Sequence, residues 1–279
     1  MILVFGHSGQ VATDLALQGA DLCLSRAQAD FEMPGALAAA IAEHRPDAVI
    51  NAAAYTAVDR AEQEPDRAFR INADAVKELA QACASAGTPL VHLSTDYVFD
   101  GSGDTPWQVT DTPAPLNVYG RSKLAGEEAV RAAGGTYAIV RTSWVVSAHG
   151  SNFVKTMLRL GAERDALSVV ADQIGAPTCA HDIAAACLEI AVQLQAAPSK
   201  SGTYHYQSQP FVSWADVARA VFAQANLSCT VTDIPSADYP TPAQRPLNSR
   251  LACTTTTERF GLDMPDWHTG VRRIVDALD

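Results

Sequence analysis

A tyrosine and a lysine stand four residues apart in the segment Tyr119-Gly120-Arg121-Ser122-Lys123. On a helix, this spacing places both side chains on one face, with about 5–6 Å between their Cβ atoms. A free phenol has a pKa of about 10, and a neighbouring ammonium lowers that pKa because it favours the phenolate. The pair is suited to protonate an alkoxide that develops on a reacting carbonyl. The pattern alone is common, and two unrelated surface residues are the alternative interpretation.

Hydroxyl side chains follow the predicted strand Leu90–Leu93, in the segment Ser94-Thr95-Asp96. In open parallel sheets, ligands bind beyond the carboxyl ends of the strands. A hydroxyl at this place is positioned to polarise the same carbonyl that Tyr119 protonates. A local turn or a helix-capping role is the alternative for Ser94 and Thr95.

A glycine-rich turn, Gly6-His7-Ser8-Gly9-Gln10-Val11-Ala12, follows the apolar run Ile2–Phe5. Its spacing is GxxGxxA, which differs from the GxG of many dehydrogenases. Glycines let the backbone approach a pyrophosphate closely, and the helix that follows offers free N–H groups and the positive end of its dipole. An ordinary tight strand–helix turn is the alternative. The position right after a short apolar strand favours dinucleotide binding.

The end of the second predicted strand indicates which dinucleotide the protein prefers. An acidic residue there would bind the 2′-hydroxyl of NAD, whereas an arginine suits the 2′-phosphate of NADP. This chain has Ser25-Arg26 after Leu22–Leu24. We therefore expect a preference for NADPH, with use of NADH left open. A solvated surface arginine is the alternative for Arg26, and Asp30 remains a candidate for the ribose or adenine side.

Short apolar runs and amphipathic helical stretches alternate in the first half of the chain, which is typical of βαβ units with right-handed crossovers. The expected fold is therefore α/β, a doubly wound parallel sheet of the Rossmann type. The predicted strands are Ile2–Phe5, Leu22–Leu24, Ala48–Ala53, Leu90–Leu93 and Tyr137–Arg141, and the predicted helices are Gln10–Gln18, Pro34–His44, Arg67–Ala86 and Gly120–Ala133.

The second half is less regular. We predict helices over Phe153–Gly161, His181–Gln195 and Val212–Ala225, the last with Ser213 as its N-cap. Ala196–Gly202 reads as a polar loop. The segment Pro235–Pro246 carries four prolines and is not regular throughout.

Composition excludes several classes of protein. The 279 residues carry a formal net charge of −11, and the pI is about 5.0, whereas proteins that bind nucleic acids or anionic membranes normally carry the opposite sign. The six cysteines form no CxxC pair and are expected to be free thiols in a reducing compartment. The sequence shows no signal peptide and no apolar run of membrane-spanning length, so we expect a cytoplasmic protein. The histidines form no HxxxH or HExxH motif, and no metal site is predicted.

These motifs together resemble the extended short-chain dehydrogenases/reductases, and more finely the family of dTDP-4-dehydrorhamnose reductases. The resemblance covers nearly the whole chain. Besides the glycine turn, Ser94–Phe99 and Tyr119–Lys123, it is carried by Val49–Asp59, Ala114–Gly120, Arg141–Val145, Asn152–Met157, Asp172–Thr178 and Tyr239–Ser249. The last two segments lie outside the expected dinucleotide fold, so they point to the substrate.

The resemblance implies a role for individual residues. Tyr119 would donate the proton, Lys123 would be its partner and a ribose contact, and Thr95 would assist at the carbonyl. Thr95, Asp96 and Trp144 would contact the sugar nucleotide. The cofactor would be lined by Gly9, Gln10, Val11, Asp30, Phe31, Ala53, Ala54 and Tyr55, in addition to Gly6 and Ser8 of the turn and to Arg26.

The implied reaction delivers a hydride to C4 of dTDP-4-dehydro-β-L-rhamnose and yields dTDP-L-rhamnose. Two other functions stay open at this point: a reductase or epimerase of another 4-keto nucleotide sugar, and a non-catalytic NADP-binding regulatory subunit. The expected architecture is a dinucleotide-binding domain over residues 1–146 and a smaller α/β domain, mainly substrate-binding, over residues 147–279. Segments of the second part return to the first domain's sheet. The expected oligomeric state is a monomer or a homodimer.

The chain departs from the family pattern at three positions. Ala12 replaces the third glycine of the turn, and Tyr55 stands where the family often has histidine. Some members bind Mg²⁺ through glutamates near a dimer interface, but the aligned position here is His181, so neither the metal nor the dimer is carried over. A hard Mg²⁺ ion prefers oxygen ligands.

Arg245 lies at the end of the proline-rich segment. Prolines rigidify a loop, and an arginine on such a loop is suited to a bidentate contact with the diphosphate of the substrate. The alternative is a surface connection in which Arg245 and Arg250 are solvated.

Overall fold

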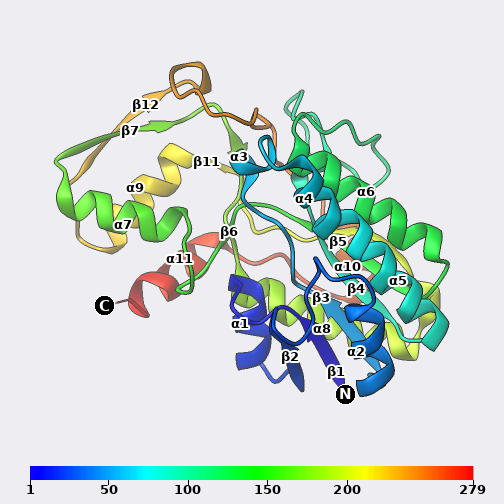
Figure 1. The fold of residues 1–279 in the computed structure, drawn as a ribbon. Helices are drawn as coiled ribbons and strands as arrows, with labels where there is room; N and C mark the ends of the chain where they lie inside the picture. The colour runs from blue at the N-terminus through cyan, green and yellow to red at the C-terminus, as the bar shows by residue number, and fades with distance from the viewer. Residues whose placement is uncertain (279) are drawn as a thin grey trace.

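The computed structural model describes residues 1–278, so Asp279 at the end of the predicted second domain lies outside it. A six-stranded sheet forms its centre, in the order β10-β5-β4-β3-β1-β2, with every neighbouring pair parallel (Figure 1). This confirms the predicted fold class. The strands are β1 (Ile2–Phe5), β2 (Leu22–Leu24), β3 (Ala48–Asn51), β4 (Leu90–Thr95), β5 (Tyr137–Thr142) and β10 (Gly202–His205).

Helices cover both faces of the sheet, because successive residues of a buried strand point to opposite sides. In β1, Leu3 and Phe5 belong to one apolar core and Val4 to the other. The first core is closed by α2 (Ala36–His44), α5 (Ala75–Ala86) and α6 (Val118–Ala133), and the second by α1 (Gln10–Leu17) and α8 (Ala180–Ala196). Both sides of the sheet are therefore covered, as in other parallel sheets.

The chain changes direction within the sheet between β1 and β3. From β1 it moves outward to β2, and it then returns to place β3 on the other side of β1. In doubly wound sheets, the crevice at such a switch point is where ligands bind. The glycine turn after β1 and the segment 52–54 after β3 both open into this crevice.

The predicted helix Arg67–Ala86 is helical throughout but not uniform. It consists of α4 (Pro65–Phe69), a π-helical turn over Arg70–Asp74, and α5. A short helix α3 (Val58–Ala61) precedes it. At the widened turn the chain packs against α6 so closely that a Cβ on Gly126 would lie 2.2 Å from the carbonyl oxygen of Asn72.

A smaller lobe lies beside the sheet, at the upper left of Figure 1. Its own apolar core includes Val154, Leu167, Val217 and Trp267. It contains α7 (Phe153–Glu163), β7 (Ala166–Val170), α9 (Trp214–Gln224), β12 (Thr230–Ile234) and α11 (Trp267–Asp276). β8 (Ile174–Gly175) pairs with β11 (Val212–Ser213), and β6 (Val145–Val146) pairs with β9 (Thr178–Cys179).

Several predictions for the second half are confirmed. The hydroxyl of Ser213 accepts a hydrogen bond from the amide of Asp216 at 3.1 Å and caps α9, which begins at Trp214. The proline-rich segment holds only a short 3₁₀ turn, Ser236–Asp238. A second 3₁₀ turn, Pro198–Lys200, occupies the predicted polar loop, and α10 (Thr254–Phe260) lies between the proline-rich segment and α11. All six cysteines are free.

The parallel pair β7–β12 is missing from the sequence predictions. Each strand is only five residues long, and its partner lies in a distant part of the chain, so neither has a local signal. Within residues 1–278, no helix is long and apolar enough to cross a membrane.

Candidate active site

The glycine turn after β1 has the geometry that a close ligand approach requires. Gly6 adopts φ +124°, and a Cβ there would lie 3.2 Å from the Cβ of Ala12 and 3.3 Å from the carbonyl carbon of Ala52. Gly9 is the N-cap of α1, and among the described residues no side chain bonds to its cap amides. The N–H groups and the dipole of α1 are therefore available to an anion in the crevice.

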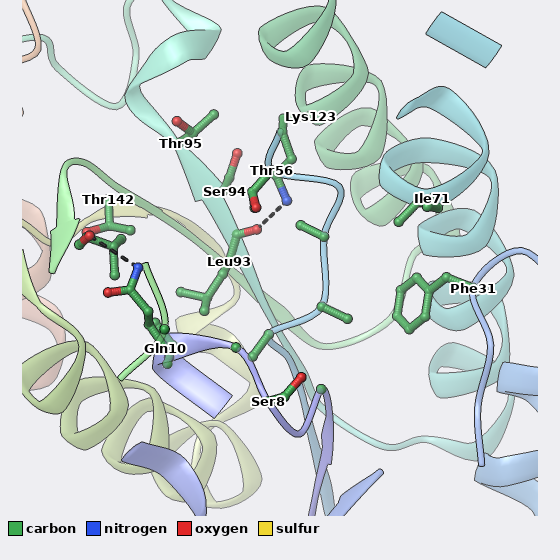
Figure 2. Close-up of a pocket in the computed structure, with 18 of the residues that line it drawn as sticks. Ser8, Gln10, Phe31, Thr56, Ile71, Leu93, Ser94, Thr95, Lys123 and Thr142 are labelled. Atoms are coloured by element: carbon green, nitrogen blue, oxygen red, sulfur yellow. Dashed lines mark hydrogen bonds between the residues drawn. The ribbon is translucent and has the colours of Figure 1, made fainter. Parts of the chain in front are cut away.

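A cleft of about 760 Å³ opens above this turn and runs across the carboxyl ends of the strands. Figure 2 shows Ser8 and Gln10 at one side of it, Thr95 and Lys123 at another, and Phe31 opposite. The cleft brings together most of the predicted site residues: Gly6, Ser8, Gly9, Gln10, Val11, Arg26, Asp30, Phe31, Ala53, Ala54, Thr95, Asp96, Tyr119, Lys123 and Trp144.

Two predicted residues do not line the cleft. Tyr55 is buried behind the wall, where its phenol donates to Glu64 at 2.9 Å and its amide donates to Asn72 at 2.8 Å. Arg245 donates to the carboxylate of Asp59 at 2.8 Å and to the carbonyl of Ala243 at 2.7 Å. This ion pair attaches the proline-rich segment to α3 and lowers the pKa of Asp59.

Gln10 connects the glycine turn to the smaller lobe. Its side-chain oxygen accepts hydrogen bonds from Ser147 and Asn152, both at 2.9 Å. Its side-chain nitrogen donates to the carbonyl of Val145 at 3.3 Å. The floor of the cleft is thus continuous from the sheet into α7, whose N-cap is Asn152.

Tyr119 and Lys123 lie on the first turns of α6, as the sequence predicts. Asn117 caps this helix by accepting from the amide of Gly120 at 2.8 Å. A Cβ on Gly120 would lie 2.2 Å from the carbonyl oxygen of Tyr97, so only glycine allows α6 to approach the 3₁₀ turn Asp96–Val98 after β4 this closely. Lys123 Nζ donates to the carbonyl of Leu93 at 2.6 Å, a contact drawn in Figure 2.

Burial dominates the protonation of this pair. It raises the pKa of Tyr119 to about 12, although hydrogen bonding to Thr95 favours the phenolate, and it lowers the pKa of Lys123 to about 8. The pKa of Tyr119 is therefore shifted upward overall, whereas a neighbouring ammonium alone would lower it, because desolvation of the phenol is the largest cause. Tyr119 consequently holds its proton at neutral pH, the state that a proton donor requires.

Thr95 and Asp96 lie at the end of β4. The Thr95 hydroxyl donates to one oxygen of Asp96 at 3.0 Å, and Ser249 donates to the other at 2.5 Å. Asp96 is 2% exposed, and burial raises its pKa to about 6. Ser249 is a residue that the sequence analysis did not single out, although it closes the segment Tyr239–Ser249.

Trp144 enters the cleft from the turn after β5 with a strained backbone. Its φ of +49° is rare for a bulky residue, and such conformations persist where the surroundings over-determine them. Gly175 makes room for the ring, because a Cβ there would lie 2.9 Å from an indole carbon of Trp144. Trp214 also lines the cleft. Nothing in the local sequence distinguishes Trp214 from an ordinary core residue.

The far end of the cleft is lined by charged side chains. Arg26 donates to Asp30 at 3.3 Å and also pairs with Glu32. Arg67 binds the same Glu32 at 3.1 Å. Hydrogen bonds, first from the amide of Glu32 and then from Arg26, lower the pKa of Asp30. Arg26 thus lies at the cleft, where the carboxylates of Asp30 and Glu32 pair with its guanidinium.

His181, which occupies the aligned metal position, lies at the start of α8. Its ring is 3.8 Å from the carboxylate of Asp14 and 3.2 Å from the side-chain nitrogen of Gln18. Within residues 1–278, no group of three or more His, Cys, Asp or Glu side chains is arranged to hold a metal ion.

The fold and this cleft define an NAD(P)H-dependent oxidoreductase of the extended short-chain dehydrogenase/reductase class. Residues 1–279 match the family described as RmlD substrate binding domain. The chain is 45% identical to a dTDP-4-dehydrorhamnose reductase of Sinorhizobium fredii, over 99% of this chain and 97% of that one, and 42% identical to one of Escherichia coli K12, with the same coverage. It belongs to this family, the dTDP-4-dehydrorhamnose reductases.

A solved structure agrees with this assignment. The dTDP-4-dehydrorhamnose reductase of Bacillus anthracis, in complex with NADP, superposes with a TM-score of 0.92 at 36% identity. The similarity covers 99% of this chain and 98% of that one. The resemblance inferred from the sequence motifs is confirmed.

Proposed function

We propose that this protein reduces the C4 keto group of dTDP-4-dehydro-β-L-rhamnose with NADPH to give dTDP-L-rhamnose. The observation that carries the proposal is the meeting of Tyr119, Lys123 and Thr95 in one cleft with the glycine turn after β1. The names of the similar proteins supply the substrate.

The residues of the cleft fit a dinucleotide. Gly6 lets the turn pack closely against Ala12 and Ala52, and a Cβ on Gly9 would meet no atom within 4 Å, so the turn is open there to a pyrophosphate. The open N-terminus of α1 supplies amides and a positive potential to the same place. When bound, the nicotinamide would supply the hydride. The bound dinucleotide would be lined by Ala53, Ala54 and Phe31, and Lys123 would contact its ribose.

The chain's own residues would handle the proton. Tyr119, held in its neutral form, donates its phenolic proton to the alkoxide oxygen that develops at C4. The Thr95 hydroxyl, which donates to Asp96 in the structure, would turn to donate to the same oxygen and orient the carbonyl. Lys123, as an ammonium, stabilises the phenolate that remains on Tyr119. Thr95 at the carboxyl end of β4 and Tyr119 on the first turns of α6 would thus both contact the oxygen at C4.

A preference for NADPH rests on Arg26, whose guanidinium would bind the 2′-phosphate. Asp30 and Glu32 pair with the same guanidinium and reduce its attraction for a phosphate. The carboxylates of Asp30 and Glu32 would also accept a hydrogen bond from the 2′-hydroxyl of NADH. We therefore propose NADPH as the preferred donor and NADH as a usable one.

The substrate side is proposed to involve Thr95, Asp96 and Trp144, with Arg245 near the diphosphate. Residues 1–146 would bind the cofactor, and residues 147–279 would mainly supply the substrate-binding lobe. Within the latter, α8 and β10 pack on or pair with the main sheet.

The direct test follows the loss of nicotinamide absorbance with dTDP-4-dehydrorhamnose, with NADPH and NADH in parallel and an EDTA control. Formation of dTDP-rhamnose supports the proposal, and unchanged turnover in EDTA separates the reaction from Mg²⁺. NADPH binding without turnover would contradict it and favour another keto-sugar or a regulatory role.

A further inference from the structure

A buried carboxylate lies one helical turn beyond Lys123. Glu127, on α6, is 0% exposed and makes four charged or polar contacts. Ser94 donates to its Oε1 at 2.6 Å, and Arg141 donates to Oε1 at 2.8 Å and to Oε2 at 2.7 Å. Arg131, one turn further along α6, donates to Oε2 at 2.7 Å. The proposed reaction does not use Glu127 directly.

The partners of Glu127 lie on the elements that carry the reacting groups. Ser94 directly precedes Thr95 on β4, and Arg141 lies on β5, three residues before Trp144. Lys123 bonds to Leu93, the neighbour of Ser94. Glu127 and Lys123 therefore attach one face of α6 to adjacent residues of β4. This pair of contacts fixes the position of Tyr119 relative to Thr95.

Glu127 also determines the charge around Lys123. Lys123 is 3% exposed and Arg141 is 1% exposed, so α6 and β5 each bury a cation; Glu127 bonds to Arg141 and lies one helical turn from Lys123. The neighbouring histidines, His92 on β4 and His205 on β10, are neutral because burial lowers their pKa. On α6 itself, Tyr119 is neutral and Arg131 is cationic. Among the described residues, Glu127 is the negative group that favours the ammonium of Lys123.

Stability alone does not explain this arrangement. Desolvation makes a buried ion pair costly, and replacing one with apolar residues is often neutral or stabilising. Removing only the carboxylate leaves buried cations uncompensated. Arginine does not release its proton in proteins, so Lys123 is the group that would become neutral.

We propose that Glu127 is a positioning residue that keeps Lys123 cationic and holds α6 against β4. The proposal rests on the proposed reduction, in which the ammonium of Lys123 stabilises the phenolate of Tyr119. It predicts that charge changes around Glu127 move the alkaline limit of function in either direction, according to their sign.

Two variants of the same cluster test this. Glu127→Gln removes the negative charge, so we expect the alkaline limit of kcat to lie about one pH unit lower and kcat above that limit to fall by up to about tenfold. Arg131→Gln removes a positive charge from a half-exposed side chain. Glu127 then acts more strongly on Lys123, and the alkaline limit moves to higher pH. Glu128→Gln, an exposed neighbour on α6, is the matched control and should behave as wild type.

The readouts separate this role from a structural one. NADPH binding by fluorescence, measured across the same pH range, should show the same opposite shifts, since Lys123 is the proposed ribose contact. Thermal unfolding of each variant reports stability independently. If Glu127→Gln does not fold, the upward shift in Arg131→Gln alone still tests the proposal.

Unshifted pH profiles in the variants that fold, whatever their melting temperatures, would overturn the proposal. Failure of the proposed function looks different. Wild-type protein would then bind NADPH without reducing the keto-sugar, and the pH dependence of NADPH binding would still decide the role of Glu127.

Discussion

The indole of Trp144 stacks on that of Trp214, with ring centroids 3.7 Å apart and an angle of 14° between the planes. Trp144 follows β5 of the main sheet, and Trp214 begins α9 of the smaller lobe. Both line the cleft. The stack thus joins the two parts of the molecule at the site.

We expect Trp214→Ala to raise the KM for the keto-sugar. Aromatic pairs contribute about 0.5–1.5 kcal/mol beyond their buried area, which corresponds to roughly a two- to tenfold increase if Trp144 loses its orientation. The dissociation constant of NADPH should stay the same. Trp107→Phe is the control, because Trp107 stacks on Phe99 and does not line the cleft. Equal effects of the two variants on KM would contradict a specific role for the stack.

Tyr119→Phe removes the proposed proton and little else, since the ring and its edge-to-face contact with Tyr97 remain. We expect kcat to fall by about 10²–10⁴-fold, the usual contribution of general acid catalysis. The affinity for NADPH, measured by fluorescence titration, should change little. Turnover at the wild-type rate would show that the proton comes from elsewhere.

Asp96 should make the folded state less stable at alkaline pH. Its pKa in the folded protein, about 6, lies above the ordinary value of 3.8. The stability associated with the protonated form is therefore complete below about pH 4 and is lost as the pH rises through 6. Asp96→Asn should raise the free energy of unfolding by ~1–3 kcal/mol at pH 8 and have little effect at pH 4.

Thermal melts of both proteins from pH 4 to pH 8 check this expectation. Asp100→Asn is a suitable control, because hydrogen bonds lower the pKa of that partly exposed carboxyl instead. A difference between Asp96→Asn and wild type that does not depend on pH would mean that the charge of Asp96 is not the cause.

Variants of the Arg245–Asp59 ion pair distinguish two roles for Arg245. It either contacts the substrate diphosphate or holds the proline-rich segment on α3. If Arg245 contacts the diphosphate, Arg245→Ala should raise the substrate KM about tenfold, since hydrogen bonds to charged groups are worth about 1.5–3 kcal/mol. Asp59→Asn should then leave KM unchanged or lower it, because it frees the guanidinium. We expect this pattern, with NADPH affinity constant in both variants. A similar rise in KM for both variants would assign Arg245 to holding the proline-rich segment on α3.

Arg26→Ala should reduce the preference for NADPH. Loss of one charge-assisted contact to the 2′-phosphate is expected to raise the KM for NADPH about tenfold and to leave that for NADH nearly constant. Asp30→Asn should act in the opposite direction, because it removes a competing carboxylate from Arg26. Steady-state kinetics with both donors give the ratio directly, and an unchanged ratio in Arg26→Ala would exclude Arg26 as the determinant.

The features that depend on neighbouring residues can be predicted from the sequence alone. The alternation of apolar runs and amphipathic stretches indicates the parallel sheet, and the glycine spacing after Ile2–Phe5 indicates the dinucleotide turn. The four-residue interval between Tyr119 and Lys123 places them on one face of a helix, and the hydroxyl of Ser213 caps α9. Each of these involves contacts within a few residues, so its signal is local.

The features that depend on distant residues follow from how the elements pack together. The pKa values of Tyr119 and Lys123 follow from how completely the surrounding elements exclude water, and the partner of Arg245 is a carboxylate from another part of the fold. Trp214 lines the cleft only because α9 packs against the turn after β5. Glu127 lies four residues from Lys123 in sequence, yet two of its partners, Ser94 and Arg141, come from β4 and β5. Burial and long-range pairing determine the pKa values and the ion pairs of this site, and neither can be predicted from the local pattern of residues.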